Sequence, residues 1–278
     1  MQKTALVTGA SAGIGEATVK RLIQDGYRVF AAARRLDRMA PLARLGAELI
    51  ALDLTDDASI LAAVETIRAA TGRLDLLVNN AGYGSYGAIE DVPMDEARRQ
   101  MEVNVFGLAR LCQLVTPLMR AQKSGTIVNV TSIGGKFGEP FGGWYHATKF
   151  AVEGFSDCLR LELRPFGIRV VVIEPGAIRT EWAGIAHQSL VERSGRSAYA
   201  PWALKHAAML GNADAMRFAS PPEVVANTIA RAAAARRPRI RYGTGGGAPV
   251  FLFLAHWLPD RWLDALMWRA SQSGKIPA

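Results

Sequence analysis

The sequence contains few of the features that mark secreted, metal-binding or disulfide-stabilised proteins. Among its 278 residues there are only two cysteines and four histidines. Cys112 and Cys158 both fall in apolar helical segments, and two cysteines of this kind provide no disulfide framework. We therefore expect both to be small core residues in a reducing, cytoplasmic compartment, and we expect no metal site.

Long apolar runs are also missing. The most apolar stretch, APVFLFLAHWL at 248–258, is too short to span a bilayer, which takes roughly 20 residues. We expect this stretch to form core or pocket wall, with weak contact to a membrane surface as the alternative. The first residues, MQKTALVTGA, enter a predicted strand directly, so we expect no signal peptide.

The positive charges do not form a concentrated basic region. A net charge of +8 would suit nucleic acid, a membrane surface or an anionic ligand. However, the arginines and lysines are spread along the chain, and no basic run is interleaved with aromatic residues that could stack on bases. We expect an arginine-rich solvated surface and no nucleic-acid partner.

Apolar patterns alternate between strands and helices along the chain. Strands are predicted at 4–8, 27–33, 48–52, 74–79, 125–131, 168–173 and 239–242, and the clearest helices at 14–24, 57–70, 95–121, 145–164 and 221–236. This alternation predicts an α/β fold of Rossmann type, with one doubly wound, mostly parallel, seven-stranded sheet covered by helices on both faces. We expect one dinucleotide-binding and catalytic domain, 1–278, with an irregular substrate-side insertion at 181–220 and a C-terminal extension at 243–278.

A glycine-rich turn follows the first predicted strand. Residues 4–8 run into Gly9-Ala-Ser-Ala-Gly13-Ile-Gly15, and a helix pattern begins at once. Glycines let the backbone approach a pyrophosphate, and the helix N-terminus offers unpaired N–H groups and the positive end of its dipole. A lone glycine repeat is weak evidence, but strand, turn and helix in this order predict a phosphate-binding corner.

The end of the second strand indicates which dinucleotide binds. An acidic residue there would hold the adenosine ribose hydroxyls, but this chain has Ala33, followed by Arg34 and Arg35. A carboxylate would repel a 2′-phosphate, whereas a guanidinium can pair with it in fork geometry. We therefore favour NADP(H) over NAD(H). The alternative is that these are two exposed arginines that open the next helix.

Three further polar positions lie where this fold would place a ligand. Asp53 ends the third strand, where it could accept a hydrogen bond from adenine or instead cap the helix at 57–70. Asn79-Asn80-Ala81-Gly82 ends the fourth strand and suits turn hydrogen bonds and close cofactor contact. Asn104 is the only strongly polar residue in the apolar stripe of the 95–121 helix. A buried amide needs a hydrogen-bond partner, so Asn104 is either a brace or part of a site.

Candidate catalytic groups come from the fifth strand and the helix after it. Ser132 follows the strand at 125–131, at the carboxyl edge where open α/β sheets bind ligands. Tyr145 and Lys149 lie four residues apart on one helix face. An ammonium one turn away would favour the phenolate and lower the phenol pKa from about 10. Alone, this spacing is typical of an ordinary helix-surface pair.

Together these motifs resemble the short-chain dehydrogenase/reductase family. Thr8-Gly-x-x-x-Gly-x-Gly15, Asn79-Asn-Ala-Gly82, Asn104, Ser132, Tyr145-x-x-x-Lys149 and Pro175-Gly176 occur in the order and approximate spacing of that family, across roughly residues 1 to 242. The glycine spacing and the length are similar to its compact branch. The resemblance implies an NADP(H)-dependent alcohol dehydrogenase or carbonyl reductase.

The resemblance also implies roles for individual positions. Tyr145 would be the general acid/base, Ser132 would hold the substrate oxygen, Lys149 would lower the phenol pKa and bind the nicotinamide ribose, and Asn104 would hold a water in a proton relay. One departure concerns the cofactor, because many NADP(H)-dependent relatives carry a basic residue where this chain has Ala12. The expected cofactor-binding residues are Gly9, Ser11, Gly13, Ile14, Gly15, Arg34, Arg35, Asp53, Leu54, Asn80, Ala81, Gly82, Tyr145, Lys149, Pro175, Gly176, Ile178 and Thr180.

The substrate is predicted from the aromatic residues near the expected pocket. Six of them suggest a bulky, apolar alcohol, ketone or aldehyde, as in the family's steroid- and retinoid-active members, although they could equally be core or interface: Phe137, Phe141, Trp144, Trp182, Trp202 and Phe218. His146 and His187 are interpreted as non-catalytic.

Two other functions remain open at this stage. The chain could be a redox-sensing regulator that binds the dinucleotide without turnover, although the complete set of catalytic residues argues against this. It could also be a peripheral membrane protein acting on lipid-like substrates through residues 250–269, which mix aromatics, leucines and arginines. The resemblance further implies a homodimer or homotetramer built on the helices that carry Asn104 and Tyr145.

Overall fold

One parallel sheet organises the chain. The computed structural model describes residues 2–211 and 218–274. The seven strands, in the spatial order β3-β2-β1-β4-β5-β6-β7, all run parallel rather than mostly so. Their bounds are β1 Thr4–Thr8, β2 Arg28–Ala33, β3 Glu48–Ala51, β4 Leu76–Asn79, β5 Gly125–Val130, β6 Ile168–Pro175 and β7 Arg241–Thr244. The strand order reverses between β1 and β4, and such a reversal creates a ligand-binding crevice at the strands' carboxyl ends.

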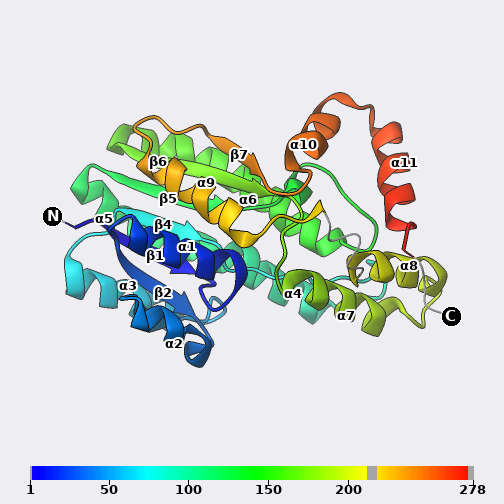
Figure 1. Cartoon of the computed structure of the whole chain (residues 1–278), viewed down its shortest axis with the longest axis horizontal. Coiled ribbons are helices and arrows are strands. Elements are labelled where there is room, and N and C mark those ends of the chain that lie inside the picture. Colours follow the sequence, from blue (N-terminus) through cyan, green and yellow to red (C-terminus); the bar gives the residue numbers. More distant parts are fainter. Residues whose placement is uncertain (1, 212–217, 275–278) are drawn as a thin grey trace.

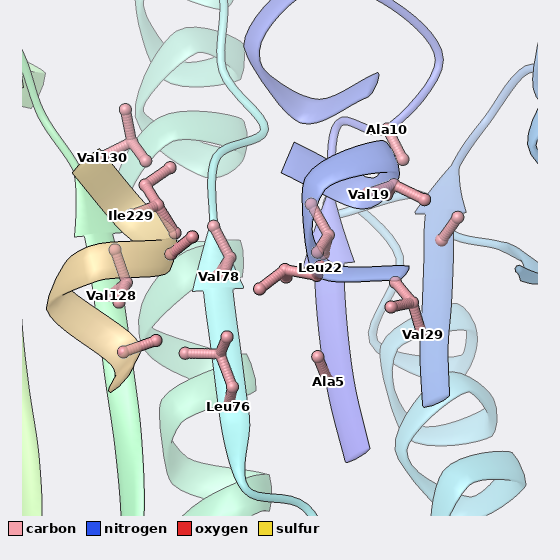
Figure 2. Close-up of a cluster of buried hydrophobic side chains, with 14 of the residues drawn as sticks. Ala5, Ala10, Val19, Leu22, Val29, Leu76, Val78, Val128, Val130 and Ile229 are labelled. Carbon is pink, nitrogen blue, oxygen red and sulfur yellow. The ribbon is translucent and has the colours of Figure 1, made fainter. Parts of the chain in front are cut away.

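Successive residues of each strand pack alternately into two separate hydrophobic cores. Ala5 and Val7 belong to one buried cluster, whereas Leu6 between them belongs to the other. This alternation follows from the two-residue period of a strand. Figure 2 shows part of the first cluster, where Leu76 and Val128 of neighbouring strands point to the same side as Ala5. Both faces are therefore apolar, as expected for a sheet buried on both sides.

Helices cover both faces of the sheet (Figure 1). The cores show which helices lie where: α1 (Gly13–Gln24), α2 (Leu36–Arg44) and α9 (Pro222–Ala234) pack on one face. The helices α3 (Asp57–Thr71), α5 (Gly107–Gln122) and α6 (Gly143–Leu163) pack on the other. The predicted single doubly wound α/β sheet is confirmed.

The long helix expected at 95–121 is interrupted. It consists of α4 (Met94–Met101), a π-helical turn η1 (Glu102–Phe106) and α5. Asn104 lies in the π turn and is buried. A π turn adds a residue to the helical turn and often marks a functional site, so it re-aims the one strongly polar member of the apolar stripe.

The expectation of an irregular segment at 181–220 is wrong. It contains α7 (Trp182–Ser194) and α8 (Ala200–Gly211), while residues 212–217 lie outside the described part of the chain. In α7 the buried side chains are Ala186, Leu190 and Ser194, spaced four apart. Such a narrow stripe of mostly small residues gives a weak helical signal, which the sequence pattern did not reveal.

The C-terminal extension contains two helices. Its helices α10 (Ala248–Trp257) and α11 (Asp260–Ser271) lie at the same end of the sheet as α7 and α8 (Figure 1). Residues 275–278 of the predicted extension are outside the described residues. Among the residues described, none of the helices combines the length and apolar character needed to cross a membrane.

Two local expectations need correction. Cys112 is buried as predicted. Cys158 is exposed, because it lies off the face of α6 that carries the buried Val152 and Ser156. Asp53 does not cap α3. The cap is Asp56, whose carboxylate accepts from Ala58 N, while Asp53 accepts from the backbone N–H and hydroxyl of Thr55.

Candidate active site

A cavity of about 890 Å³ lies at the carboxyl ends of the strands. It takes lining residues from the glycine turn after β1, from the ends of β2, β4, β5 and β6, and from α6, α7, α8, α10 and α11. The strand-end edge predicted from the sequence is therefore the floor of this cavity, and the four helices beyond the sheet are its walls.

The glycine turn has the geometry of a phosphate cradle. Gly9 and Gly13 have φ of 67° and 57°, a left-handed backbone that glycine adopts without steric cost. The turn leads into α1, so the unpaired N–H groups of that helix face the cavity side of the turn. Gly15 acts differently, because a Cβ there would lie 2.2 Å from the Gly9 carbonyl oxygen. Its role is to let α1 pack against the turn.

The segment after β4 holds this turn in place. The Thr8 hydroxyl accepts from the backbone N–H groups of Asn80 and Ala81, at 3.0 Å each. In return, the Asn80 side chain donates to the Thr8 carbonyl at 3.0 Å. Asn79 instead donates to Asn129 Oδ1 of the neighbouring strand at 2.9 Å. Asn80 thus braces the turn, and Asn79 braces two neighbouring strands.

The two arginines after β2 have different partners. Arg35 donates to Ser11 Oγ at 3.3 Å and lies 3.6 Å from Glu181. Arg34 also lines the cavity, yet its guanidinium makes no hydrogen bond or ion pair with any described residue. Arg34 is therefore the guanidinium available to a ligand. Asp53 lies nearby: burial raises the pKa of its carboxyl, but the Thr55 hydrogen bonds and the charge of Arg34 outweigh burial and lower it.

Tyr145 and Lys149 share one face of α6, inside the cavity. Lys149 Nζ lies 5.7 Å from the centre of the Tyr145 ring and donates to the Val130 carbonyl at 3.1 Å. Burial lowers the pKa of Lys149 to about 8, opposed by the negative charge of Glu153. Burial also raises the pKa of Tyr145 to about 12, and the Ser132 hydroxyl opposes that rise. The expected lowering of the phenol pKa does not occur in this structure, because desolvation of the phenolate dominates.

Ser132 is held at the end of β5 by its own turn. Its hydroxyl oxygen accepts from Gly134 N at 3.0 Å, capping the short 3-10 helix η2 (Ile133–Gly135). A hydroxyl has one hydrogen and two lone pairs, so this bond leaves the hydrogen available to donate to the Tyr145 hydroxyl or to a ligand. Ser132, Tyr145 and Lys149 all line the cavity.

Asn104 lies behind the cavity wall rather than in it. Its amide nitrogen donates to the Tyr83 carbonyl at 2.9 Å and to Thr148 Oγ1 at 3.1 Å, and its oxygen accepts from Tyr83 N at 3.1 Å. Thr148 in turn donates to the Tyr145 carbonyl. Asn104 is thus a brace between the segment after β4 and α6. Its role in a proton relay stays a prediction.

Most of the predicted cofactor residues line this one cavity. Only Gly15 does not. The aromatic prediction is less accurate: Phe137, Trp182 and Phe218 line the cavity, but Phe141, Trp144 and Trp202 do not. His187 also lies outside it, and its ring nitrogen Nδ1 donates to the Ala207 carbonyl at 2.7 Å.

A group of polar side chains in the cavity was not predicted to act. Tyr86 is fully buried, its ring centre 6.0 Å from that of Tyr145, and its hydroxyl donates to Glu139 Oε1. His146, directly after Tyr145, lies with Nε2 3.5 Å from the same oxygen. The His206 ring stacks on the Tyr86 ring, with 6.0 Å between their centres. These residues come from three separated parts of the chain, at 86, 139–146 and 206, so no local motif indicates them.

Comparison with known proteins gives the family. The family model described as short chain dehydrogenase matches residues 3–189. A 3-ketodihydrosphingosine reductase of Bacteroides thetaiotaomicron is 35% identical over 262 residues, covering 93% of this chain and 94% of that protein. An NADPH-dependent 3-dehydrocapnine reductase of Ornithobacterium rhinotracheale is 34% identical over 277 residues, covering 95% and 96%.

A solved structure agrees with this assignment. The crystal structure of a short-chain dehydrogenase from Streptomyces avermitilis superposes with a TM-score of 0.77 at 31% identity, covering 98% of this chain and 96% of that one. Such coverage extends the likeness beyond the matched family model to the C-terminal helices. The chain belongs to the short-chain dehydrogenase/reductase family, and it is an oxidoreductase.

Proposed function

We propose that this oxidoreductase is an NADP(H)-dependent reductase and dehydrogenase, which interconverts a bulky apolar ketone or aldehyde and its alcohol. The observation that carries the proposal is the placement of Ser132, Tyr145 and Lys149 in one cavity with the glycine turn. A hydroxyl donor, a phenol and an ammonium at one point are suited to proton exchange with a carbonyl or alcohol oxygen.

NADP(H) fits the residues that line the cavity between the glycine turn and Arg34, which we call the cofactor half. The left-handed glycines leave the backbone open to a pyrophosphate, and a Cβ on Gly13 would fill that space and meet the Thr180 side chain at 2.9 Å. The free Arg34 guanidinium suits a 2′-phosphate. The name of the Ornithobacterium relative specifies NADPH, which supports the same choice. When bound, the cofactor supplies or takes up the hydride.

The chain's own residues manage the proton. In reduction, negative charge develops on the substrate oxygen, where Tyr145 donates its proton and Ser132 donates a hydrogen bond. The nearby ammonium of Lys149 stabilises the phenolate that remains. These contacts strengthen as charge develops, so they act mainly on the transition state. Tyr145 and Lys149 are buried, and the low dielectric around them strengthens these interactions.

The rest of the cavity, on the side of α8, α10 and α11, is the substrate half, and it is mostly apolar. Phe251 of α10 and Met267 of α11 line it on one side, and Met209, Leu210 and Phe218 line it elsewhere. These walls suit a hydrocarbon body or tail, as in a steroid-, retinoid- or lipid-like compound. The name of the Bacteroides relative specifies reduction of a keto lipid base, which supports a lipid-like ketone.

A substrate screen tests the proposal. The purified protein is mixed with NADPH or NADH and a panel of apolar ketones and aldehydes, and oxidation of the cofactor is followed by its absorbance. We expect turnover with NADPH that is lost in Tyr145→Phe, while the variant still binds NADPH. No turnover across the panel, with NADPH still bound, would favour the dinucleotide-binding regulator instead.

Contact with a membrane surface is a second candidate, because one feature favours it. Phe253 and Trp257 of α10 and Trp262 of α11 are 62%, 68% and 71% exposed, while neighbouring residues of the same helices line the cavity. Aromatic side chains of this kind insert at the headgroup level of a bilayer. Co-sedimentation with liposomes tests this candidate. It requires binding that falls in a Trp257→Gln, Trp262→Gln double variant, with turnover of a soluble ketone unchanged.

We also propose assembly into a homodimer or homotetramer through the long helices. Phe106 of η1 and Phe150 and Leu161 of α6 are 53%, 47% and 59% exposed. Large apolar side chains on two neighbouring helices suit an interface between copies. Light scattering on the purified protein tests this, and a monomer at micromolar concentration would contradict it.

A further inference from the structure

Glu153 is a buried carboxylate one helical turn after Lys149. Both residues lie on α6, four positions apart, so their side chains share a face of that helix. Glu153 is 5% exposed and Lys149 is 8% exposed. They form no direct ion pair, and the carboxylate oxygens accept from three other residues instead. A charge this deeply buried is costly unless such partners satisfy it.

Glu153 holds the strand end that carries Ser132. Its Oε1 accepts from the Thr131 hydroxyl at 2.6 Å. Thr131 stands in the chain between Ser132 and Val130, and the Val130 carbonyl accepts from Lys149 Nζ at 3.1 Å. A carboxylate bound to the middle one of these three residues therefore restrains both the hydrogen-bond acceptor of Lys149 and the hydroxyl of Ser132.

The other carboxylate oxygen binds two cations from separate elements. Oε2 accepts from Lys136 Nζ, in the loop after η2, at 2.7 Å and from Arg241 Nε of β7 at 2.9 Å. The 3-10 helix η2 also packs directly on α6 here. A Cβ on Gly135 would lie 3.0 Å from Glu153 Cγ and 3.2 Å from the Lys149 carbonyl oxygen. Glu153 thus joins α6, β5, β7 and the loop after η2 at one point.

The cations beside Glu153 are shared with two more carboxylates. Glu174 of β6 lies 3.4 Å from Lys136 and 3.6 Å from Arg241. Asp157, one turn further along α6, pairs with Arg241 at 2.7 Å. Burial raises the pKa of Glu174, and the charge of Glu153 raises it further, while the two cations oppose the rise. Because two cations serve three carboxylates, they do not fully neutralise the charge of Glu153.

Lys149 faces this negative charge. Burial lowers the pKa of Lys149 to about 8, and the charge of Glu153 opposes that fall. Two phenols lie on the elements packed around Lys149, namely Tyr145 on α6 and Tyr83 after β4. Burial raises the pKa of each to about 12, so both are neutral, and the Tyr83 hydroxyl donates to Glu96. Glu153 therefore supplies negative charge that favours the Lys149 ammonium.

We propose that Glu153 is a positioning residue for the reaction: it restrains the strand end that carries Ser132 and supplies the negative charge that favours the ammonium of Lys149. The proposal rests on the proposed function, in which Lys149 acts through its charge on the phenolate of Tyr145. Glu153 does not line the cavity, so it acts through Lys149 and Thr131 rather than by contact with a ligand.

The pH profile of ketone reduction tests the role of the charge. Glu153→Gln removes the charge and keeps the shape of the side chain. With NADPH, we expect kcat/KM of the wild type to fall with a midpoint near pH 8. In the variant the midpoint should move down by about one pH unit, since the two groups lie about 6 Å apart along the helix. Glu153→Asp keeps the charge and should restore the midpoint.

Asp157→Asn is the matched control. It removes a carboxylate from the same group of charges, but one turn further from Lys149 and 40% exposed, so the midpoint should stay in place. Thermal melting establishes that each variant is folded. A lower melting temperature with an unmoved midpoint in Glu153→Gln would make Glu153 a structural brace and overturn the proposal. Equal shifts in Glu153→Gln and Asp157→Asn would overturn it as well.

Thr131→Val tests the strand end separately, and it does so even if Glu153→Gln does not fold. This variant loses the hydroxyl that Glu153 holds and keeps every charge. We expect kcat to fall about tenfold at all pH values, as for the loss of a buried hydrogen bond, with the midpoint unchanged. A normal kcat would mean that the contact of Glu153 with Thr131 does not position Ser132.

A readout without turnover separates this proposal from the proposed function. In protein labelled with ¹³C-lysine, the Cε signal of Lys149 is assigned by its absence in Lys149→Arg, and it reports the protonation of that amine. We expect its midpoint to fall by about one pH unit in Glu153→Gln. An unmoved signal in a protein that reduces ketones would overturn the role of Glu153 alone. A moved signal in a protein that reduces no ketone would overturn the proposed function and keep the charge relationship between Glu153 and Lys149.

Discussion

Lys149 Nζ lies 5.7 Å from the centre of the Tyr145 ring, and both side chains are only 8% exposed. Burial works in opposite directions on the two groups: it lowers the pKa of the ammonium and raises that of the phenol. Desolvation disfavours the charged form of each group. The phenol is therefore neutral, and the ammonium loses its proton more easily than an exposed lysine does. Carbonyl reduction requires a proton donor, and the charge of the neighbouring ammonium decides how readily this phenol gives up its proton.

The pH dependence of reduction should follow Lys149. Because its pKa is about 8, the ammonium loses its proton above that pH, and the remaining phenol becomes a poorer acid. Tyr145, with a pKa of about 12, stays protonated throughout. We expect kcat/KM for ketone reduction to be level below about pH 7 and to fall above about pH 8, since kcat/KM reports groups of the free enzyme. A rise through pH 8 would contradict this assignment.

Lys149→Arg provides the control for that profile. A guanidinium keeps its proton at all accessible pH values, so whatever activity this variant retains should show no inflection near pH 8. An unchanged inflection would assign the titration to another group.

Removal of the two groups at the substrate oxygen should lower kcat rather than raise KM. General acid–base groups contribute about 10²–10⁴-fold, so we expect a loss of that order in kcat for Tyr145→Phe. Ser132→Ala should lose about 10²–10³-fold, as for removal of one oxyanion donor. Steady-state kinetics with a reducible ketone measure both. A raised KM with normal kcat would mean that these groups only bind substrate.

The sequence predicted what depends on neighbouring residues. The glycine turn, the Tyr145–Lys149 pair and the alternation of strands and helices are local patterns, and the structure contains all of them. Arg34 lines the cavity, as its position at a strand end in this fold indicates. The roles of these residues stay predictions.

What the sequence could not reveal depends on distant segments coming together. Glu139 and His206 lie far apart in the chain and meet through Tyr86, which itself comes from a third segment. The raised pKa of Tyr145 was missed for a similar reason, since desolvation is set by α7 and α8 packing over it. Three of the six aromatic residues do not line the cavity, and one of them, Trp202, lies on a helix that the sequence pattern did not reveal.

Gly15 should be intolerant of any side chain. A Cβ there would lie 2.2 Å from the Gly9 carbonyl oxygen, which is backbone and has little freedom to move. We expect Gly15→Ala to lower the free energy of unfolding by about 1–3 kcal/mol, as for an overpacked site, and to weaken NADPH binding. Denaturant unfolding and cofactor titration measure the two effects.

Gly154 of α6 is the matched control for Gly15. A Cβ there would meet nothing within 4 Å, and the position is helical. Gly154→Ala should therefore raise the free energy of unfolding by about 0.5–1 kcal/mol, because alanine is the better helix former. Equal effects of the two substitutions would mean that the close approach of Gly15 to Gly9 is unimportant.

Arg34 should determine the choice between the two dinucleotides. Its guanidinium makes no hydrogen bond or ion pair with any described residue, so no such contact would have to break for a 2′-phosphate to bind. We expect wild-type protein to bind NADPH much more tightly than NADH, and Arg34→Ala to weaken NADPH binding about ten- to hundredfold, with NADH binding unchanged. Arg44→Ala, which removes an exposed arginine at the end of α2, should change neither affinity. Fluorescence titration of each protein with both cofactors measures this. Equal or tighter binding of NADH by the wild type would make Arg34 a surface charge, and NAD(H) would then be the cofactor to use with every ketone named above.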